Sequence, residues 1–535
     1  MPSPFLPGDR APPAKVVSDV ASVLLPALLA PHLSALAQAL GKPQDGPERV
    51  ALQERHLQAL TGRVLTPGGW AGGARHAGAE PLVTGRARPY GESTLRKAAR
   101  PMSRAGAVSA AEAVLQQQVH DAVGQEHVTA YTDEYDQVYW TKKPAHAGPV
   151  GGLGNRVLGC TYFGLTFVRT RGGPNLGYHV SWHKPASPLI DALQALHQDP
   201  PRHDWLSEHV ARHVLDRGTQ GDPTLPWALS QGIPYLTLKK GSVNWRRYRH
   251  PTCELANGVP IFVRADERRK DDERPAEGQA RMAVKIVFPA RPSQGRENGR
   301  AIVYRTGAEV SDEELMRLDE VYKARWPHNE NAIKALIAVG FEANLDRTLS
   351  PTTSRGQDGA QARMGRALDR LETKLQPLQE KAERTTKEQG QLARLLEKQA
   401  SKREGLEKLQ AAPASLGTRV DRGAEHLYKV LMLMVFNALA LVLWRSPIEA
   451  VRTMSPVKVC QLLLWRPAVA CIERGTVTLW LEPMVEREDG TRQRELVKLL
   501  NKAKLELRGA HLLLKIRDPA GKIPAVPATQ ELFAF

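Results

Sequence analysis

The stretch ARHVLDRGTQGDPTLPWALSQGIPYLTLKK, residues 211–240, sets the fold that we expect for this chain. Residues 212–215 predict a short strand that ends at Asp216. Residues 225–231 predict a helix, and residues 232–238 predict a second strand. A strand followed by a helix and another strand is typical of an α/β sheet. Because open α/β sheets bind ligands at the carboxyl ends of their strands, Asp216 lies where a functional side chain is expected.

The region before this stretch is rich in β-branched and aromatic residues, which predicts further strands. Residues 128–132 predict a strand that ends at Asp133. Residues 156–170 and 176–183 predict antiparallel strands joined by Gly-rich turns, and residues 187–197 predict a helix. A second aspartate is therefore expected at a strand end.

A charge-rich helix is predicted downstream, over residues 311–336, with an acidic start and apolar residues at helical spacing. It carries Tyr322, Arg325, Trp326, Glu330 and Lys334. A carboxylate among cations and an aromatic residue suits a place where a metal ion and a phosphate backbone meet. Most charge-rich helices are only solvated faces, so this one gains a function only if other carboxylates join Glu330.

Asp133, Asp216 and Glu330 together would suit two-metal phosphoryl transfer. Carboxylates at neighbouring strand ends can share a metal ion, and a helix that crosses the sheet can bring a third ligand. Mg²⁺ keeps most of its waters and takes few protein carboxylates, so three acids are enough; Mn²⁺ is the alternative ion. Glu134 and Asp136 compete with Asp133 for this role. The structural alternatives are a turn acid, a strand-end cap and a solvated helix face.

The composition favours a polyanionic partner. The 535 residues include 74 Lys and Arg against 57 Asp and Glu, which gives a formal net charge of +17 and a pI of about 9.7. Nucleic acid is the first expectation and an anionic membrane the second, with a generally basic proteome as the alternative explanation.

Cysteine usage and hydropathy predict a cytoplasmic protein without a membrane partner, and a DNA partner would make it nucleoid-associated. The four cysteines lie far apart without metal-binding spacing, and the N-terminus lacks the order of a signal peptide. The most membrane-like stretch, residues 427–444, contains Lys429 and Asn437. We therefore expect it to be a buried core helix.

The length predicts two to four domains. We expect a helical domain that binds DNA ends over residues 1–125. A catalytic domain over residues 126–349 should contain a β-rich insertion at about residues 240–305. A heptad segment over residues 359–412 predicts either a coiled coil between two chains or a helical hairpin. Residues 418–535 predict a small α+β module.

Basic side chains in two of these regions are candidates for DNA contacts. Arg96 and Lys97 would project from a short N-terminal helix, or belong to a basic connector. Arg246 and Arg247 alternate with aromatic residues, which suits backbone contacts with base stacking, although a solvated hairpin is the alternative. For Trp326 we expect packing in a core, with stacking on an extruded base as the alternative.

Three blocks of the chain resemble the bacterial insertion-sequence transposases that carry a DDE site on an RNase H-like fold. The blocks are residues 129–140 (TAYTDEYDQVYW), residues 211–240 and residues 321–334 (VYKARWPHNENAIK). The resemblance implies an RNase H-like mixed sheet with a β-rich insertion between the second Asp and the Glu-bearing helix.

The resemblance also implies roles for individual residues. Asp133, Asp216 and Glu330 would be the catalytic residues and the Mg²⁺ ligands. The signature residues expected to contact or lie near DNA are Tyr322, Arg325 and Lys334. Such an enzyme hydrolyses a phosphodiester at the element ends, and the freed 3′-hydroxyl then attacks target DNA. Since two ends must be held together, a homodimer on double-stranded DNA is implied.

The chain departs from the family's pattern in the third block. The family has three residues between Arg and Glu, whereas four residues separate Arg325 from Glu330. The family spacing falls on Asn329, whose amide cannot replace a carboxylate ligand. We expect the helix to restart near Pro327 and so return Glu330 to the site. The alternatives are a catalytically decayed DNA-binding relic and an RNase H-like nuclease without strand transfer.

Overall fold

The computed structural model of the protein has a mixed α/β fold. The structure describes residues 15–17, 19–42, 44–65, 80–86, 89–91, 94–95, 99–104, 106–139, 151–152, 159–183, 189–216, 224–238, 253–254, 260–265, 282–286, 302–305, 312–341, 347–352, 355–411, 415–420, 422–473 and 475–517. The chain divides into two compact units: the first holds residues 1–137, 162–345 and 422–535, and the second holds residues 138–161 and 346–421.

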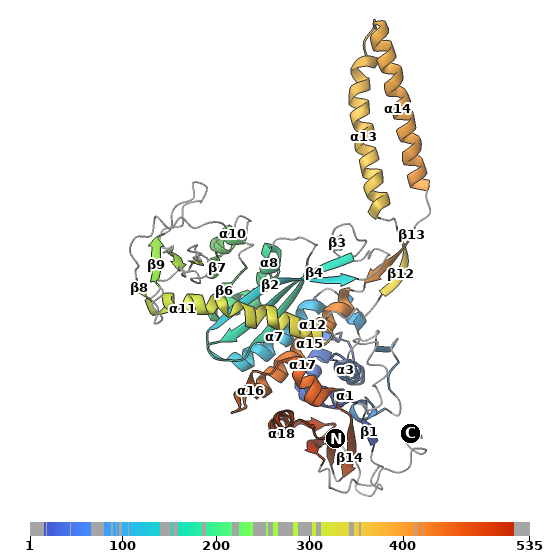
Figure 1. Cartoon of the computed structure of the whole chain (residues 1–535). Coiled ribbons are helices and arrows are strands. Elements are labelled where there is room, and N and C mark those ends of the chain that lie inside the picture. The colour runs from blue at the N-terminus through green and yellow to red at the C-terminus, as the bar shows by residue number, and fades with distance from the viewer. Residues whose placement is uncertain are drawn as a thin grey trace. The chain divides into compact units, whose positions relative to one another are not determined.

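A mixed sheet is the centre of the first unit (Figure 1), and its strands run in the order β11-β7-β6-β2-β4-β5. The strands are β2 (Val128–Tyr139), β4 (Gly159–Thr170), β5 (Leu176–His183), β6 (Val210–Val214), β7 (Tyr235–Leu238) and β11 (Ile302–Arg305). Strands β2, β6 and β7 are parallel to one another, whereas β4 and β5 form an antiparallel pair. The α/β sheet predicted from the sequence is therefore confirmed.

Helices α7 (Ala107–Val123) and α15 (Arg422–Trp444) pack against the sheet at β5, and α8 (Leu189–His197) also contacts this strand. Helix α15 is long and apolar enough to cross a membrane, but 78% of its most apolar window is buried inside the protein. Two of its polar residues are bonded in the core: the Lys429 ammonium donates to the carbonyl of Phe341, and the Asn437 amide bonds both backbone groups of Gly177. A β-carbon at Gly177 would lie 2.6 Å from Leu433, so glycine permits this close packing. The expected core helix is present.

The N-terminal helices share the core of the central sheet rather than forming a separate helical domain. Helices α1 (Ala21–Leu28), α2 (Ala30–Leu40) and α3 (Pro47–Thr61) contribute leucines to the same hydrophobic cluster as Phe163 and Phe167 of β4. Seven of the eight α1 residues are buried, including Ser22 and Pro26. A helix buried on nearly every side needs several partners, so it packs into a larger core.

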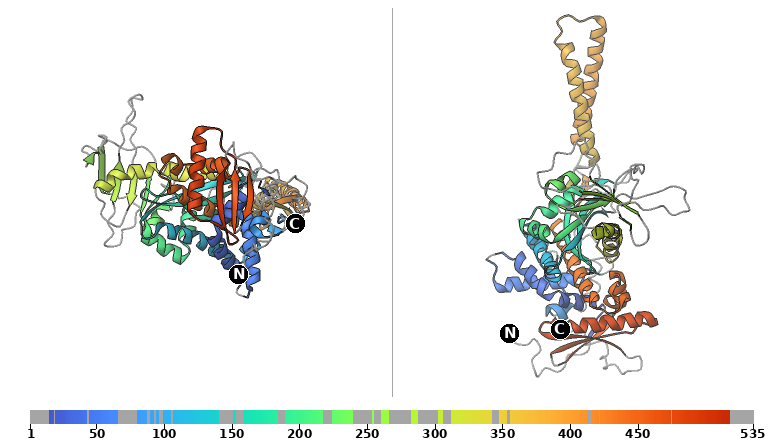
Figure 2. Two further views of the ribbon diagram at one scale, coloured as in Figure 1. Left: turned by 90° about the horizontal axis from the view of Figure 1, so that it is seen from below. Right: turned by 90° about the vertical axis from the view of Figure 1, so that its left-hand side faces the viewer.

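The C-terminal region forms a second sheet, which also uses the N-terminal end of the chain (Figure 2). Its order is β1-β14-β15-β17-β16, with the strands β1 (Lys15–Val17), β14 (Ala468–Glu473), β15 (Thr476–Leu481), β16 (Glu506–Leu507) and β17 (Ala510–Ile516). Strand β1 pairs with β14, and helix α18 (Arg487–Lys502) packs against β17. The predicted α+β character is present, and the core is shared with the rest of the first unit.

The region expected to be a β-rich insertion contains a small antiparallel sheet. Its strands are β8 (Cys253–Glu254), β9 (Pro260–Ala265) and β10 (Met282–Ile286). Strand β11 continues this region and returns the chain to the central sheet by pairing with β7.

The second unit contains a long antiparallel helical hairpin, built from α13 (Arg355–Gln379) and α14 (Thr386–Ala411). Strands β12 (Arg347–Thr352) and β13 (Ser415–Val420) pair where the chain enters and leaves the hairpin. The heptad pattern left open a coiled coil between chains or a hairpin within one chain. The structure contains the hairpin, which Figure 1 shows in orange.

Candidate active site

Asp133 and Asp216 lie side by side because their strands are adjacent, parallel and in register. Tyr131 of β2 pairs with Val214 of β6, and each aspartate follows its paired residue by two positions. The pleat alternates side chains, so a shift of two residues keeps both on the same face. The hydroxyl of Thr237 on β7 donates to the carbonyl of Asp216 at 3.0 Å, which fixes the backbone beyond the end of β6.

The strand that carries Asp133 is longer than the sequence predicts. We expected it to end at Asp133, but β2 continues to Tyr139. Asp133 nevertheless lies at the end of the parallel pairing, because the β2–β6 register stops at Tyr131 and Val214. Asp133 therefore lies at the end of the β2–β6 hydrogen-bond ladder and not at the end of its own strand.

Glu330 reaches the same place through a π-helical turn. Helix α11 (Asp312–Lys323) is followed by a π turn over Trp326–Glu330 and then by α12 (Asn331–Ala338). The N–H of Asn331 donates to the carbonyl of Trp326, five residues earlier, instead of to the fourth residue back. A π turn accommodates one extra residue within a helix, and such turns are frequent at functional sites.

The π turn resolves the irregular spacing between Arg325 and Glu330. One added residue would rotate the following side chains by about 100° in an α-helix, but the wider turn keeps Glu330 on the face of Arg325. Asn329, on which the family spacing falls, is fully buried, and neither polar atom of its side chain has a hydrogen-bond partner among the described residues. We expected the helix to restart near Pro327: α11 ends at Lys323 and the π turn begins at Trp326, with helical backbone at Arg325 between them, so the return of Glu330 to the site comes from the π turn.

The guanidinium of Arg325 connects the three carboxylates. Its Nη2 lies 2.7 Å from Asp133, and its Nη1 lies 2.8 Å from Glu330 and 3.5 Å from Asp216. Three acidic side chains that are far apart in sequence therefore converge on one cation. We call Asp133, Asp216, Glu330 and Arg325 the carboxylate cluster.

Burial and charge perturb the groups of this cluster in a consistent way. Burial raises the pKa of Asp133; Arg325 opposes that rise, and the neighbouring carboxylates of Asp216 and Glu330 add to it. For Arg325, burial alone would lower the pKa, but the three carboxylates and Tyr322 outweigh burial and raise the pKa. Clustered like charges that need a nearby cation are typical of functional sites.

The donor set suits a hard divalent cation. Carboxylate oxygens are the ligands that Mg²⁺ takes from proteins, usually one or two per ion with waters and substrate phosphates completing the shell. Among the described residues, no group of three or more acidic, His or Cys side chains is arranged closely enough to coordinate a metal ion as it stands. Instead, Arg325 supplies the positive charge between the acids. Asp133, Asp216 and Glu330 are the residues that would hold such an ion.

Two residues that sequence reasoning did not single out support the π turn. The Asn175 amide donates to the carbonyl of His328 at 2.6 Å, and the Arg169 guanidinium contacts the His328 ring. Arg169 also donates to the carbonyl of Gly173 at 2.7 Å. The pKa of His328 is lowered to about 4, mainly by burial and secondly by the positive charge of Arg169. These residues belong to the β4–β5 hairpin, and no sequence signal marks an Arg and an Asn in a turn as supports of a distant helix.

The other predicted DNA-contacting residues have different environments. Tyr322 is only 8% exposed, and Lys334 is exposed, with its ammonium 4.5 Å from the ring centre of Trp326. Our expectation that Trp326 packs in a core is wrong, since 55% of it is exposed. Four predicted DNA-binding residues lie outside the described residues: Arg96, Lys97, Arg246 and Arg247.

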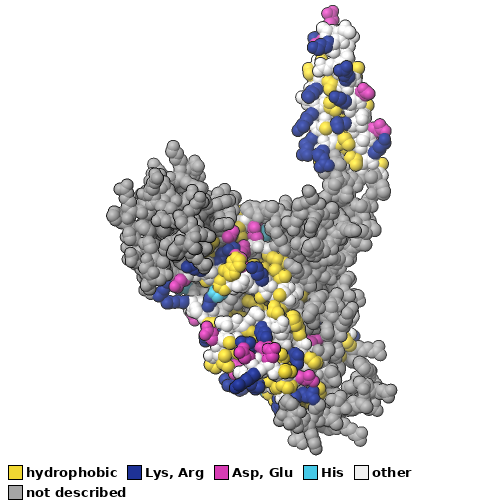
Figure 3. Space-filling view, in the orientation of Figure 1, with side chains coloured by type: hydrophobic (Ala, Val, Ile, Leu, Met, Phe, Trp, Pro, Cys, Tyr) yellow, Lys and Arg dark blue, Asp and Glu magenta, His cyan; other side chains and the backbone are white. Residues whose placement is uncertain are grey.

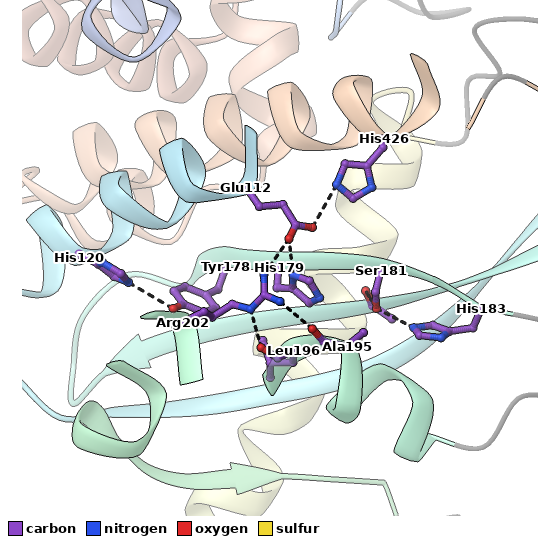
Figure 4. A network of polar contacts seen from close by, with 11 residues as sticks. Glu112, His120, Tyr178, His179, Ser181, His183, Ala195, Leu196, Arg202 and His426 are labelled. Atoms are coloured by element: carbon purple, nitrogen blue, oxygen red, sulfur yellow. Dashed lines mark hydrogen bonds and ion pairs between the residues drawn. The ribbon is translucent and has the colours of Figure 1, made fainter. Parts of the chain in front are cut away.

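A second polar network lies in the core, between β5 and the helices that cover it (Figure 4). Glu112 of α7 lies 2.8 Å from Arg202, 3.3 Å from His179 and 3.1 Å from His426. Burial alone would raise the pKa of Glu112, but contacts with His179 and His426 outweigh burial and lower it. Arg202 also donates to the carbonyls of Leu196 and Ala195. The network ties α7, β5, α15 and the helix at Pro200–His209 together, so we assign it a structural role.

Comparison with known proteins adds no assignment: no protein-family model matches this chain, and no curated protein sequence matches it.

Proposed function

We propose that this chain is a Mg²⁺-dependent DNA transposase with a DDE site formed by Asp133, Asp216 and Glu330. One observation carries the proposal: three carboxylates distant in sequence converge on Arg325, at the carboxyl ends of two adjacent parallel strands. The strand order β5-β4-β2-β6-β7, with an antiparallel hairpin on one side and parallel strands on the other, supports an RNase H-like arrangement.

The π turn favours an active enzyme over a decayed relic. The extra residue between Arg325 and Glu330 would remove the carboxylate from a regular helix, but the wider turn compensates for it. A chain that had lost its function would have no need to keep Glu330 directed at Asp133 and Asp216. The catalytic reading is therefore preferred over a DNA-binding relic.

The chain's own residues would perform three tasks in this reaction, and the metal would supply the chemistry. Bound Mg²⁺ would activate the attacking oxygen and stabilise the leaving oxygen of an in-line displacement. Asp133 and Asp216 would hold the metal from the sheet, and Glu330 would close the site from the helix. Arg325 would exchange its contacts with the carboxylates for a DNA phosphate, since a guanidinium binds phosphate in a bidentate manner. The partners would be double-stranded DNA and a second copy of the chain. The protein would be cytoplasmic and associated with the nucleoid.

A cleavage and strand-joining assay tests the proposal. Wild type, Asp216→Ala and the control Glu134→Gln would be incubated with DNA carrying the element ends and a target duplex, with Mg²⁺ or with EDTA. Wild type and Glu134→Gln should give nicked and joined products in Mg²⁺ only, and Asp216→Ala should give neither. Products without joining would favour the nuclease alternative, and equal products from all three proteins would overturn the metal-site assignment.

A further inference from the structure

The helical hairpin has two flanks with different chemistry. Leu371 and Leu375 of α13 face α14, and the residues next to them in sequence project to either side of this seam. Glu372 marks one flank, where its carboxylate accepts from Gln399 at 3.1 Å and from Arg403 at 3.0 Å. Arg370 and Lys374 come one residue before each leucine, so they project from the opposite flank.

That opposite flank is basic on both helices. Helix α13 contributes Arg363, Arg370 and Lys374, and α14 contributes Arg394 and Lys398. These residues recur at intervals of four or seven, which keeps them on one side of each helix. Figure 3 shows Lys and Arg side chains along the length of the hairpin. We call these five residues the basic flank.

The basic flank has no internal neutralisation among the described residues. All five side chains are exposed, and none makes an ion pair within the part of the chain that the structure describes. By contrast, Lys381 pairs with Glu388, and Arg403 pairs with Glu372. Two pairs on the flank, Arg370 with Lys374 and Arg394 with Lys398, place like charges four residues apart. Such pairs disfavour a helix by themselves, so this arrangement suits a surface that meets an anion.

We propose that the basic flank binds the phosphate backbone of duplex DNA. From Arg363 to Lys374 the array is about 16 Å long at 1.5 Å per residue, which is about half a turn of B-form DNA. Arginine and lysine side chains that make no ion pair among the described residues can supply sequence-independent affinity by releasing counterions from phosphates. The inference deepens the proposed function, since it takes DNA as the substrate, and it assigns to the hairpin a second contact with that substrate.

The test measures DNA binding by the full chain in EDTA, so that it does not depend on cleavage. The probe is a fluorescent random-sequence duplex, titrated at several salt concentrations. The flank variant is K374Q/K398Q, and the matched control is K381Q/R403Q, which removes the same charge from exposed positions of the same hairpin. A variant with all five flank residues changed to Gln tests the full surface. Glutamine is a good helix former, and circular dichroism checks that each variant stays folded.

Each lost phosphate contact should reduce the slope of log Kd against log salt by about 0.9. We expect a decrease of about 1.8 for K374Q/K398Q, about 4.5 for the five-residue variant, and none for K381Q/R403Q. Equal slopes for the two double variants would overturn the proposal. The proposal would also be overturned if the five-residue variant kept its DNA affinity but changed from dimer to monomer. That result would show that the basic flank contacts a second copy of the chain. If the flank binds DNA but no Mg²⁺-dependent cleavage occurs, the proposed catalysis fails and this inference stands.

Discussion

Replacement of Arg325 by methionine should make the stability of the protein depend on Mg²⁺. The guanidinium lies within 3.5 Å of three carboxylates and is largely buried. Its removal takes away the cation that Asp133, Asp216 and Glu330 share. Removing one partner from a buried ion pair costs about 3–5 kcal/mol. Since Asp216 is partly exposed to solvent, we expect the lower part of that range, about 3 kcal/mol in EDTA.

Metal binding should return most of this loss, because Mg²⁺ would replace the missing positive charge. A ligand present at one hundred times its Kd stabilises the native state by about 2.7 kcal/mol. Urea unfolding at pH 7.5, in EDTA and in saturating Mg²⁺, measures the effect. The matched control is Arg63→Met, which breaks the buried pair between Arg63 and Glu80 and leaves the carboxylate cluster intact.

We expect both variants to be destabilised in EDTA and only Arg325→Met to recover in Mg²⁺. If Mg²⁺ raised the unfolding free energy of both variants equally, its effect would be general and the reasoning would be refuted. A loss in Arg325→Met that Mg²⁺ does not reduce would refute it as well.

Three further predictions follow from burial and charge. Glu330→Gln should abolish strand cleavage, whereas Asn329→Leu should leave cleavage intact. Asn329→Leu should also raise the unfolding free energy by about 1–3 kcal/mol, because it removes two buried polar atoms that have no hydrogen-bond partner among the described residues. A cleavage assay and urea unfolding measure these two effects. Burial raises the pKa of Asp133, so above about pH 4 the native state binds more protons than the unfolded state, and stability falls as pH rises through the folded pKa. Asp133→Asn should therefore weaken the dependence of the unfolding free energy on pH, measured from pH 4 to 7. Contacts with histidines lower the pKa of Glu112, so the stability that its carboxylate contributes is present above about pH 4 and is lost as pH falls toward the folded pKa. Glu112→Gln should therefore lower the unfolding free energy by about 3–5 kcal/mol at pH 7. In the same urea unfolding measurement, the difference from wild type should become smaller at acidic pH.

Much of the candidate site could be predicted from local sequence patterns. β-branched residues before Asp133 and Asp216 mark two strands, and parallel strand ends meet at one edge of a sheet. The helical spacing after residue 311 placed Glu330 on a helix, and the structure has that helix. These features depend on neighbouring residues, which the sequence displays directly.

Features that depend on distant contacts could not be predicted. The π turn is stabilised from outside by Asn175 and Arg169 of the β4–β5 hairpin, so the helix alone gives no reason for it. The pairing of β1 with β14 joins strands from opposite ends of the sequence, and no local pattern specifies that partner. Trp326 is 55% exposed and lies against the ammonium of Lys334, whereas its apolar surface alone predicted burial.

Anomalous diffraction from crystals soaked in Mn²⁺ tests the central claim most directly. Mn²⁺ has the oxygen preference of Mg²⁺ and is visible by its anomalous signal. The account predicts a peak within about 2.1 Å of carboxylate oxygens of Asp133 and Asp216, with Glu330 nearby and Arg325 displaced from its present contacts. No peak at these carboxylates at saturating Mn²⁺, with Arg325 still bonded to Asp133 and Glu330, would contradict it.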